Sequence, residues 1–108
     1  MNTANGAYSH AEGIQNYVGG TCGHVEGGIN NSLGDYAHAE GNCTQTKNST
    51  EHAEGTYNKS NKGETPADKT QHSIGIGTGV NARKNAVEVM KNGDAYIVGI
   101  GGYDGTNY

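Results

Sequence analysis

The chain has 108 residues, of which 31% are hydrophobic and 19 are glycine, and it contains neither Trp nor Phe. This composition argues against a single large apolar core, although the length suits one small domain. The net charge is −4 and the seven Lys and Arg residues leave no basic stripe for a nucleic-acid backbone. No segment has the pattern of a signal peptide or a membrane span. We therefore expect neither a nucleic-acid partner nor membrane contact by this segment.

A repeat of 14 residues begins near residue 8. Its central pentapeptide reads SHAEG, GHVEG, AHAEG and EHAEG, at residues 9–13, 23–27, 37–41 and 51–55. A fixed period predicts stacked units that bury one another's faces. Fourteen residues are too few for a helical hairpin and suit one coil of a β-solenoid, with two strands of about five residues and two tight turns. The expected coils are residues 8–21, 22–35, 36–49 and 50–61.

The columns of the repeat assign side chains to positions in the coil. A glycine closes each motif, where a turn requires positive φ (Gly13, Gly27, Gly41 and Gly55). Three residues later, most coils have an Asn, which tolerates the left-handed conformation at a corner (Asn16, Asn30 and Asn58). Alternation along a strand places His and Glu on one face and the small residue between them on the other. The predicted interior is thin and contributes only on the order of 1 kcal/mol per small side chain, so the roll needs partners.

The register is interrupted at residues 62–69, a polar stretch that contains the only proline and is expected to form a surface loop. The repeat resumes in a last coil over residues 70–80. Alignment on Gly77 places Ile74 and Ile76 where the other coils have His and Glu. Two isoleucines would be unusual on a solvated face, so this face is expected to be buried between chains.

The pattern changes after residue 80, where the roll of residues 1–80 is expected to end. Residues 81–100 hold two short alternating runs around Asn92-Gly93, which is typical of a β-hairpin, here predicted to cap the last coil. Residues 101–108 are expected to leave the roll as a flexible exit segment. Cys22 and Cys43 lack metal-like spacing and fall in different columns of the repeat, so we predict two free thiols, with an intermolecular or inter-coil disulfide as the alternative.

The 14-residue period, and the SIGIG form at residues 73–77 in particular, resemble the head repeats of trimeric autotransporter adhesins, the YadA-like head. The resemblance covers roughly residues 8–80. It implies a left-handed parallel β-roll, three copies of which pack about a threefold axis on a bacterial cell surface. This chain departs from the family pattern in carrying His and Glu at two positions that are generally Val, Leu or Ile. The repeats and residues 85–105 also resemble phage tail-fibre proteins, which would place the chain in a virion.

Together these observations predict an all-β, homotrimeric, left-handed β-roll with a structural and adhesive role, without catalysis and without a cofactor. The expected partners are two further copies of the chain and a host surface protein or glycan as receptor. Hydrogen bonds from His to Glu between chains would fix the alignment of the trimer. The predicted interface layers are His10, Glu12, His24, Glu26, His38, Glu40, His52, Glu54, Ile74 and Ile76. The predicted turn glycines are Gly13, Gly27, Gly41, Gly55 and Gly77, and the predicted contact loop contains Lys62, Glu64, Pro66 and Asp68.

Other interpretations of the His-x-Glu motif stay open. Imidazole and carboxylate are ligands of Zn, Ni and Fe, but four similar layers favour packing over one dedicated metal site. Acid–base catalysis needs two groups in unlike environments, which a repeat does not provide. The pairs are also compatible with a simple solvated face. As a further alternative, the chain belongs to a larger glycan-degrading or autoproteolytic fibre whose catalytic domain lies outside this segment.

Overall fold

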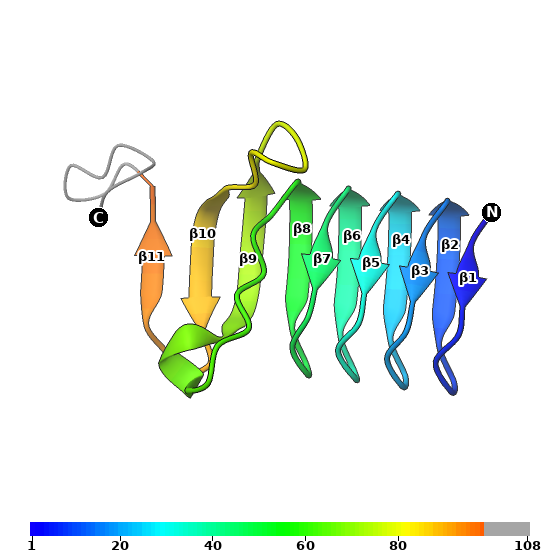
Figure 1. The fold of residues 1–108 in the computed structure, drawn as a ribbon, viewed down its shortest axis with the longest axis horizontal. Coiled ribbons are helices and arrows are strands. Elements are labelled where there is room, and N and C mark those ends of the chain that lie inside the picture. Colours follow the sequence, from blue (N-terminus) through cyan, green and yellow to red (C-terminus); the bar gives the residue numbers. More distant parts are fainter. Residues whose placement is uncertain (99–108) are drawn as a thin grey trace.

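The computed structural model describes residues 1–98, which form a β-solenoid with two sheets (Figure 1). The larger sheet has seven strands: β2 (His10–Ile14), β4 (His24–Gly28), β6 (His38–Asn42), β8 (His52–Thr56), β9 (Thr70–Ile76), β10 (Asn85–Met90) and β11 (Ala95–Ile97). The smaller sheet has four: β1 (Thr3–Ala4), β3 (Tyr17–Val18), β5 (Asn31–Ser32) and β7 (Gln45–Thr46). No helix in the described part of the chain is long and apolar enough to cross a membrane.

Successive coils stack in parallel with a step of 14 residues, since His10 pairs with His24 and His24 with His38. The predicted all-β solenoid with 14-residue coils is confirmed. The expectation of two five-residue strands in each coil is wrong for one of them, because the second strand has only two residues. A turn takes up the rest of that half-coil. At Gly20, which lies in this turn, a Cβ would overlap the carbonyl oxygen of Gly34.

Both corners of each of the first four coils contain a residue with positive φ. One series precedes the long strand and the other follows it, with φ between 41° and 61°: Tyr8, Cys22, Tyr36 and Thr50, and Gln15, Ile29, Cys43 and Tyr57. The left-handed conformation is unfavourable for residues with a Cβ. Hydrogen bonds between coils offset this strain, because Ile29 N donates to Ile14 O and Cys22 N to Ala7 O, both at 2.8 Å.

The asparagine column lies one residue beyond the corner, so the prediction that Asn itself takes the left-handed conformation is wrong. Asn16 and Asn30 are buried inside the stack. The Asn30 side-chain amide donates to Glu26 O at 2.7 Å and to Gly41 O at 3.0 Å, while Oδ1 of Asn16 accepts from the backbone N of Asn30 at 2.9 Å. The column is therefore a ladder that satisfies backbone groups inside each coil and between neighbouring coils.

The glycine column has the predicted positive φ, between 93° and 108°, at Gly13, Gly27, Gly41 and Gly55. These glycines lie within the long strands and not in turns. A Cβ at Gly27 would overlap the carbonyl oxygen of Gly41 in the next coil. Both the backbone conformation and the close approach of coils therefore require glycine.

The interior is as thin as predicted. Between the sheets lie Val18, Ser32, Thr46 and Ser60 from one side, and Val25, Ala39, Ala53 and Ser73 from the other, all buried. Val18, Val25 and Ala39 form the hydrophobic core cluster, with Ala11 packed against it. This small apolar core means that much of the stack is held by hydrogen bonds and close backbone packing.

The last coil continues the large sheet, but two residues away from the predicted register. His72 pairs with His52, Ser73 with Ala53, Ile74 with Glu54, Gly75 with Gly55 and Ile76 with Thr56. Ile74 therefore lies beside the glutamates and not the histidines, and Ile76 lies outside both columns. Gly77 is not part of the glycine column. Both registers leave Ile74 on the outer face; the observed one places the small Ser73 beside Ala53 and Gly75 beside Gly55, where a Cβ on Gly75 would overlap Thr56 O.

The loop and the hairpin complete the described chain. Residues 62–69 leave the stack, with an isolated bridge between Lys62 and Lys69 at the base and an exposed 3-10 turn at Pro66–Asp68. Strand β10 pairs antiparallel with β9, and β11 with β10, which covers the edge of the last coil. Residues 99–100 of the predicted cap and the predicted exit segment 101–108 lie outside the described residues.

Candidate functional site

The outer face of the seven-stranded sheet carries two rows of polar side chains, and we call this surface the His-Glu face. The first row contains His10, His24, His38, His52 and His72, and adjacent ring centroids lie 4.5–4.9 Å apart. The second row contains Glu12, Glu26, Glu40 and Glu54. The rows follow directly from the in-register pairing of the strands, because residues two apart on a strand share a face.

Glutamates reach the histidine of the next coil along the stack. Nε2 lies 3.2 Å from the carboxylate for His38 and Glu26, 2.8 Å for His52 and Glu40, and 3.1 Å for His72 and Glu54. The His–Glu hydrogen bonds, which were predicted between chains, form here between neighbouring coils of one chain. Each pair connects two neighbouring strands and supports the register of the stack.

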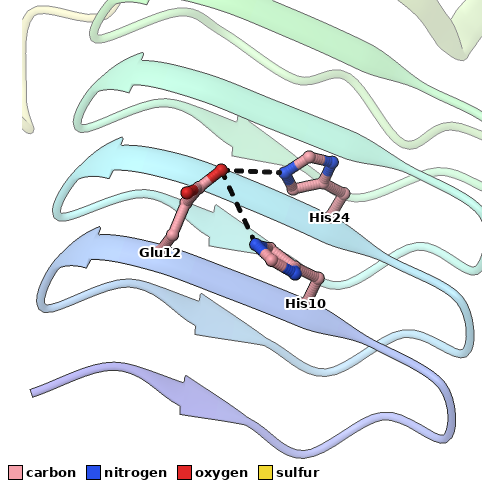
Figure 2. Close-up of side chains that lie close together, drawn as sticks. All are labelled: His10, Glu12 and His24. Carbon is pink, nitrogen blue, oxygen red and sulfur yellow. Dashed lines mark ion pairs between the residues drawn. The ribbon is translucent and has the colours of Figure 1, made fainter.

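The first pair of histidines is arranged differently. Oε1 of Glu12 lies between two imidazoles, 3.6 Å from His10 Nε2 and 3.7 Å from His24 Nε2 (Figure 2). The His10 and His24 rings are tilted by 69°, whereas the later pairs are stacked with angles of 2–12°. His24 Nε2 is shielded from solvent and has no hydrogen-bond partner among the described residues.

The pKa of Glu40 shows the electrostatic effect of the rows. The hydrogen bond from His52 lowers the pKa of this carboxyl below 4.5, burial opposes the shift, and the charge of His38 adds to it. The Glu40 side chain is 34% exposed, so water screens part of the interaction. The carboxylate form is therefore favoured by its histidine neighbours.

Apolar residues continue the rows at the C-terminal end of the face. In the glutamate row, Glu54 is followed by Ile74, Val87 and Ile97. In the histidine row, His72 is followed by Val89 and Ala95. Ile74 and Ile97 remain 36% and 47% exposed. One face thus has a charged part over the coils and an apolar part over the last coil and the hairpin.

Glu51 is a second kind of glutamate, fully buried inside the stack. Its Oε1 accepts hydrogen bonds from Lys47 N, Asn48 N, Asn48 Nδ2 and Ser60 Oγ, at 2.8–3.0 Å. Its Oε2 is buried without a partner in the described part of the chain. Burial raises the pKa of Glu51, although these hydrogen bonds lower it in part. The sequence did not predict a role for Glu51, because it occupies the variable position just before the repeated His.

The basic residues and the predicted contact loop lie toward the C-terminal half of the chain. All seven Lys and Arg residues fall between residues 47 and 91. A shallow groove is lined by Lys47, Lys62, Lys69 and Lys91, together with Asp35. Lys62 connects this groove to the predicted contact residues Glu64, Pro66 and Asp68, which are all exposed. Polar and accessible, this region is suited to contact with a partner.

The predicted site residues are brought together in part. The eight His and Glu residues of the four motifs share one face, and Ile74 joins them in the glutamate row. His72 was missed as the fifth histidine, although its distance of 20 residues from His52 equals one coil plus a six-residue insertion. Cys22 and Cys43 are free thiols, as predicted, the first exposed and the second buried.

Comparison with known proteins gave no match, whether to a family model, a curated protein or a solved structure.

Proposed function

We propose that this chain is a structural and adhesive module of a surface appendage, and that three copies pack through the His-Glu face. The observation that carries the proposal is the continuity of this face. The histidine row runs over all five long coil strands and the glutamate row over the first four, and both rows then become apolar. The fold itself does not require identical outward side chains in every coil, so the repetition points to a repeated contact.

Charge complementarity favours a second copy of the chain as the occupant of this face. Each coil presents an imidazole beside a carboxylate, and the later side chains are only 33–41% exposed even in the single chain. The same face of another copy would supply carboxylates to the imidazoles and imidazoles to the carboxylates. Burial of Ile74, Val87 and Ile97 against their equivalents would add apolar area.

The two parts of the face also favour one alignment of the copies. An apolar end placed against a charged end would leave His and Glu buried without partners, which is unfavourable. Parallel copies in register place charged against charged and apolar against apolar. Parallel alignment is compatible with a threefold axis along the stack, as the resemblance to trimeric autotransporter heads implies.

The remaining parts of the proposal extend the same resemblance. The left-handed roll and its place on a bacterial cell surface follow from the adhesin family, whereas a phage tail fibre would place the module in a virion. The loop with Lys62 and Pro66 is the proposed contact with a host protein or glycan. The open reading frame around this segment distinguishes an adhesin from a phage tail fibre, since an adhesin would add a coiled-coil stalk and a membrane anchor.

The first test is the solution mass by sedimentation equilibrium at neutral pH, on untagged, metal-free protein. We expect three times the chain mass of 11.2 kDa. Ile97→Asp should dissociate the trimer, because it places a charge in the apolar part of the face. Leu33→Asp is the matched control: Leu33 is 49% exposed and Ile97 47%, but Leu33 follows β5 in the smaller sheet.

Circular dichroism verifies that both variants remain folded. A folded monomer at every concentration would contradict the proposal. So would a trimer that Leu33→Asp dissociates and Ile97→Asp leaves intact, because the contact would then involve the smaller sheet.

A further inference from the structure

The N-terminal end of the His-Glu face differs from the rest of it in three ways. Along the later coils each Glu is hydrogen-bonded to a His, whereas Glu12 lies 3.6 and 3.7 Å from His10 and His24, beyond hydrogen-bonding distance (Figure 2). The two rings are tilted and not stacked. Finally, His24 Nε2 is shielded from solvent yet has no hydrogen-bond partner among the described residues. The repeat alone does not account for this exception.

We propose that His10, Glu12 and His24 form a binding site for one divalent transition-metal ion, with Zn²⁺ as the representative ligand. The three ligand atoms all lie within 4.8 Å of one another. Zn–N and Zn–O distances of about 2.0–2.1 Å in a tetrahedral site separate neighbouring ligand atoms by roughly 3.4 Å. The Nε2–Oε1 distances of 3.6 and 3.7 Å are slightly longer, so small side-chain rotations bring the ligands to bonding distance.

The surroundings of these side chains permit such rotations. In the single chain the side chains of His10 and Glu12 are 61% and 56% exposed, so a metal ion can reach them from solvent, with the shielded Nε2 of His24 beside the Glu12 carboxylate. Tilted rings direct their Nε2 atoms toward a common point beside the carboxylate, as Figure 2 shows, whereas stacked rings direct them in parallel. Because Glu12 forms no hydrogen bond with either ring, the ion does not have to break one.

The later coils are less suited to metal. The groups His24–Glu26–His38 and His38–Glu40–His52 also bring three ligand atoms together. In both of them, however, the carboxylate is already hydrogen-bonded to the second His, at 3.2 and 2.8 Å. The first of these groups also shares His24 with the proposed site. We therefore place the strongest metal binding at the first two coils.

The ligand chemistry indicates the class of ion. Two imidazole nitrogens and one carboxylate oxygen suit Zn²⁺, Ni²⁺ and Cu²⁺, and are too rich in nitrogen for Ca²⁺ or Mg²⁺. Three protein ligands leave the fourth position of a tetrahedral ion to water. The ion would connect β2 to β4 and stabilise the N-terminal end of the stack. All three ligands belong to one chain, so the site goes beyond the proposed trimer and does not depend on it.

Isothermal titration calorimetry of untagged, metal-free protein with ZnCl₂ at neutral pH tests the proposal. The readout is the stoichiometry and affinity of the binding event with the highest affinity. We expect one Zn²⁺ ion per chain in that event. His10→Gln and Glu12→Gln should each weaken it at least tenfold. The matched controls are His72→Gln and Glu54→Gln, which remove the same side chains from the opposite end of the rows and should change the affinity less than twofold. The melting temperature of the wild type should rise with Zn²⁺, and that of His10→Gln should not.

Two results would overturn the metal site. One is the absence of Zn²⁺ binding by the folded protein. The other is an equal loss of affinity in all four variants, which would show binding by the histidine row as a whole. The mass of the metal-free protein is measured separately, so a trimer without Zn²⁺ binding contradicts the metal site alone, and a Zn²⁺-binding monomer contradicts the trimer alone.

Discussion

The interior of the coil stack and its His-Glu face repeat with the same 14-residue period, but for different reasons. Where the coils pack on one another, the repeat is imposed by space and bonding: Gly27 leaves no room for a Cβ beside the next coil, and the buried Asn30 is bonded to backbone groups in its own coil and in the next. On the face, His38 and Glu26 point outward from positions that any strand residue can occupy. Repetition inside is therefore explained by folding, whereas repetition outside calls for a contact or a ligand.

The largest effect that this comparison predicts is that of Gly27→Ala. The new Cβ would overlap Gly41 O, and Ala is unfavourable at φ +108°. Backbone strain and overpacking each contribute about 1–3 kcal/mol, so we expect the free energy of unfolding to fall by at least about 3 kcal/mol. Urea denaturation measures it. Gly28→Ala is the control, because its Cβ would meet nothing closer than Asn42 Oδ1 at 3.9 Å. An equal loss of unfolding free energy in the two variants would contradict this prediction, because it would show that neighbouring coils can shift to accommodate the new Cβ at Gly27.

The next effect in size is that of Asn30→Ala. The change removes two donated hydrogen bonds and the acceptor of Thr44 N, all inside the stack. Leaving buried backbone groups without partners costs about 1–3 kcal/mol each, partly relieved by water, so we expect a loss of about 2–3 kcal/mol in unfolding free energy. Asn31→Ala, one residue away and half-buried, has no bonded side-chain oxygen in the described chain and should change stability by less than about 0.5 kcal/mol. A similar loss in both variants would contradict the role of the ladder.

These two positions show what the sequence predicted well. The solenoid, its period, its small interior and the positive φ of Gly27 all follow from residue spacing and the alternation of a strand. The Asn column correctly marked the corner of the coil, but the predicted role of Asn was wrong. Asn acts through its side-chain amide, and the residue in the left-handed conformation is the one before it. Spacing alone does not distinguish these two uses of Asn.

Other features depend on contacts that spacing does not contain. The register of the last coil was misjudged because SIGIG offers two glycines, Gly75 and Gly77, for the glycine column, and the close contact between coils that selects Gly75 beside Gly55 is not visible in the spacing. The distinct geometry of His10, Glu12 and His24 was hidden, because all four motifs look alike in one dimension. The end of a stack lacks a preceding coil with a Glu partner for His10, so its side chains pair differently.

Glu51 is a glutamate buried inside the stack, so it can be compared directly with the glutamates of the His-Glu face. Burial raises its pKa, so the stability that it contributes is full below the unfolded pKa, about 4.3, and is lost as the pH rises through the raised value. Glu51→Gln removes the charge and keeps an accepting oxygen. We expect a gain on the order of 1 kcal/mol in unfolding free energy at pH 7, and no gain at pH 4. Denaturation at both pH values measures it, with exposed Glu64→Gln as the control. A gain that does not depend on pH would contradict the buried charge.

Glu40→Gln has the smallest expected effect and tests the contribution of the His-Glu face. The pKa of Glu40 is lowered by His52, so its contribution is present above the ordinary value of 4.5 and is lost as the pH falls through the lowered one. For a pair one-third exposed, the loss at pH 7 in a single chain is about 0.2–1 kcal/mol, and Glu12→Gln should lose less, because Glu12 has no hydrogen bond to a histidine.

Protein concentration decides how the result for Glu40→Gln is interpreted. If the His-Glu face is only a solvated surface, the loss is small at every concentration, and the face needs another explanation for its repeat. If the face is buried between copies, the same substitution removes three charges from one layer of the trimer at once, and the midpoint of unfolding falls further as the protein is diluted. A loss as large as that of Asn30→Ala, and dependent on concentration, would show that the outer rows are as necessary to the assembled module as the inner ladder is to the single chain.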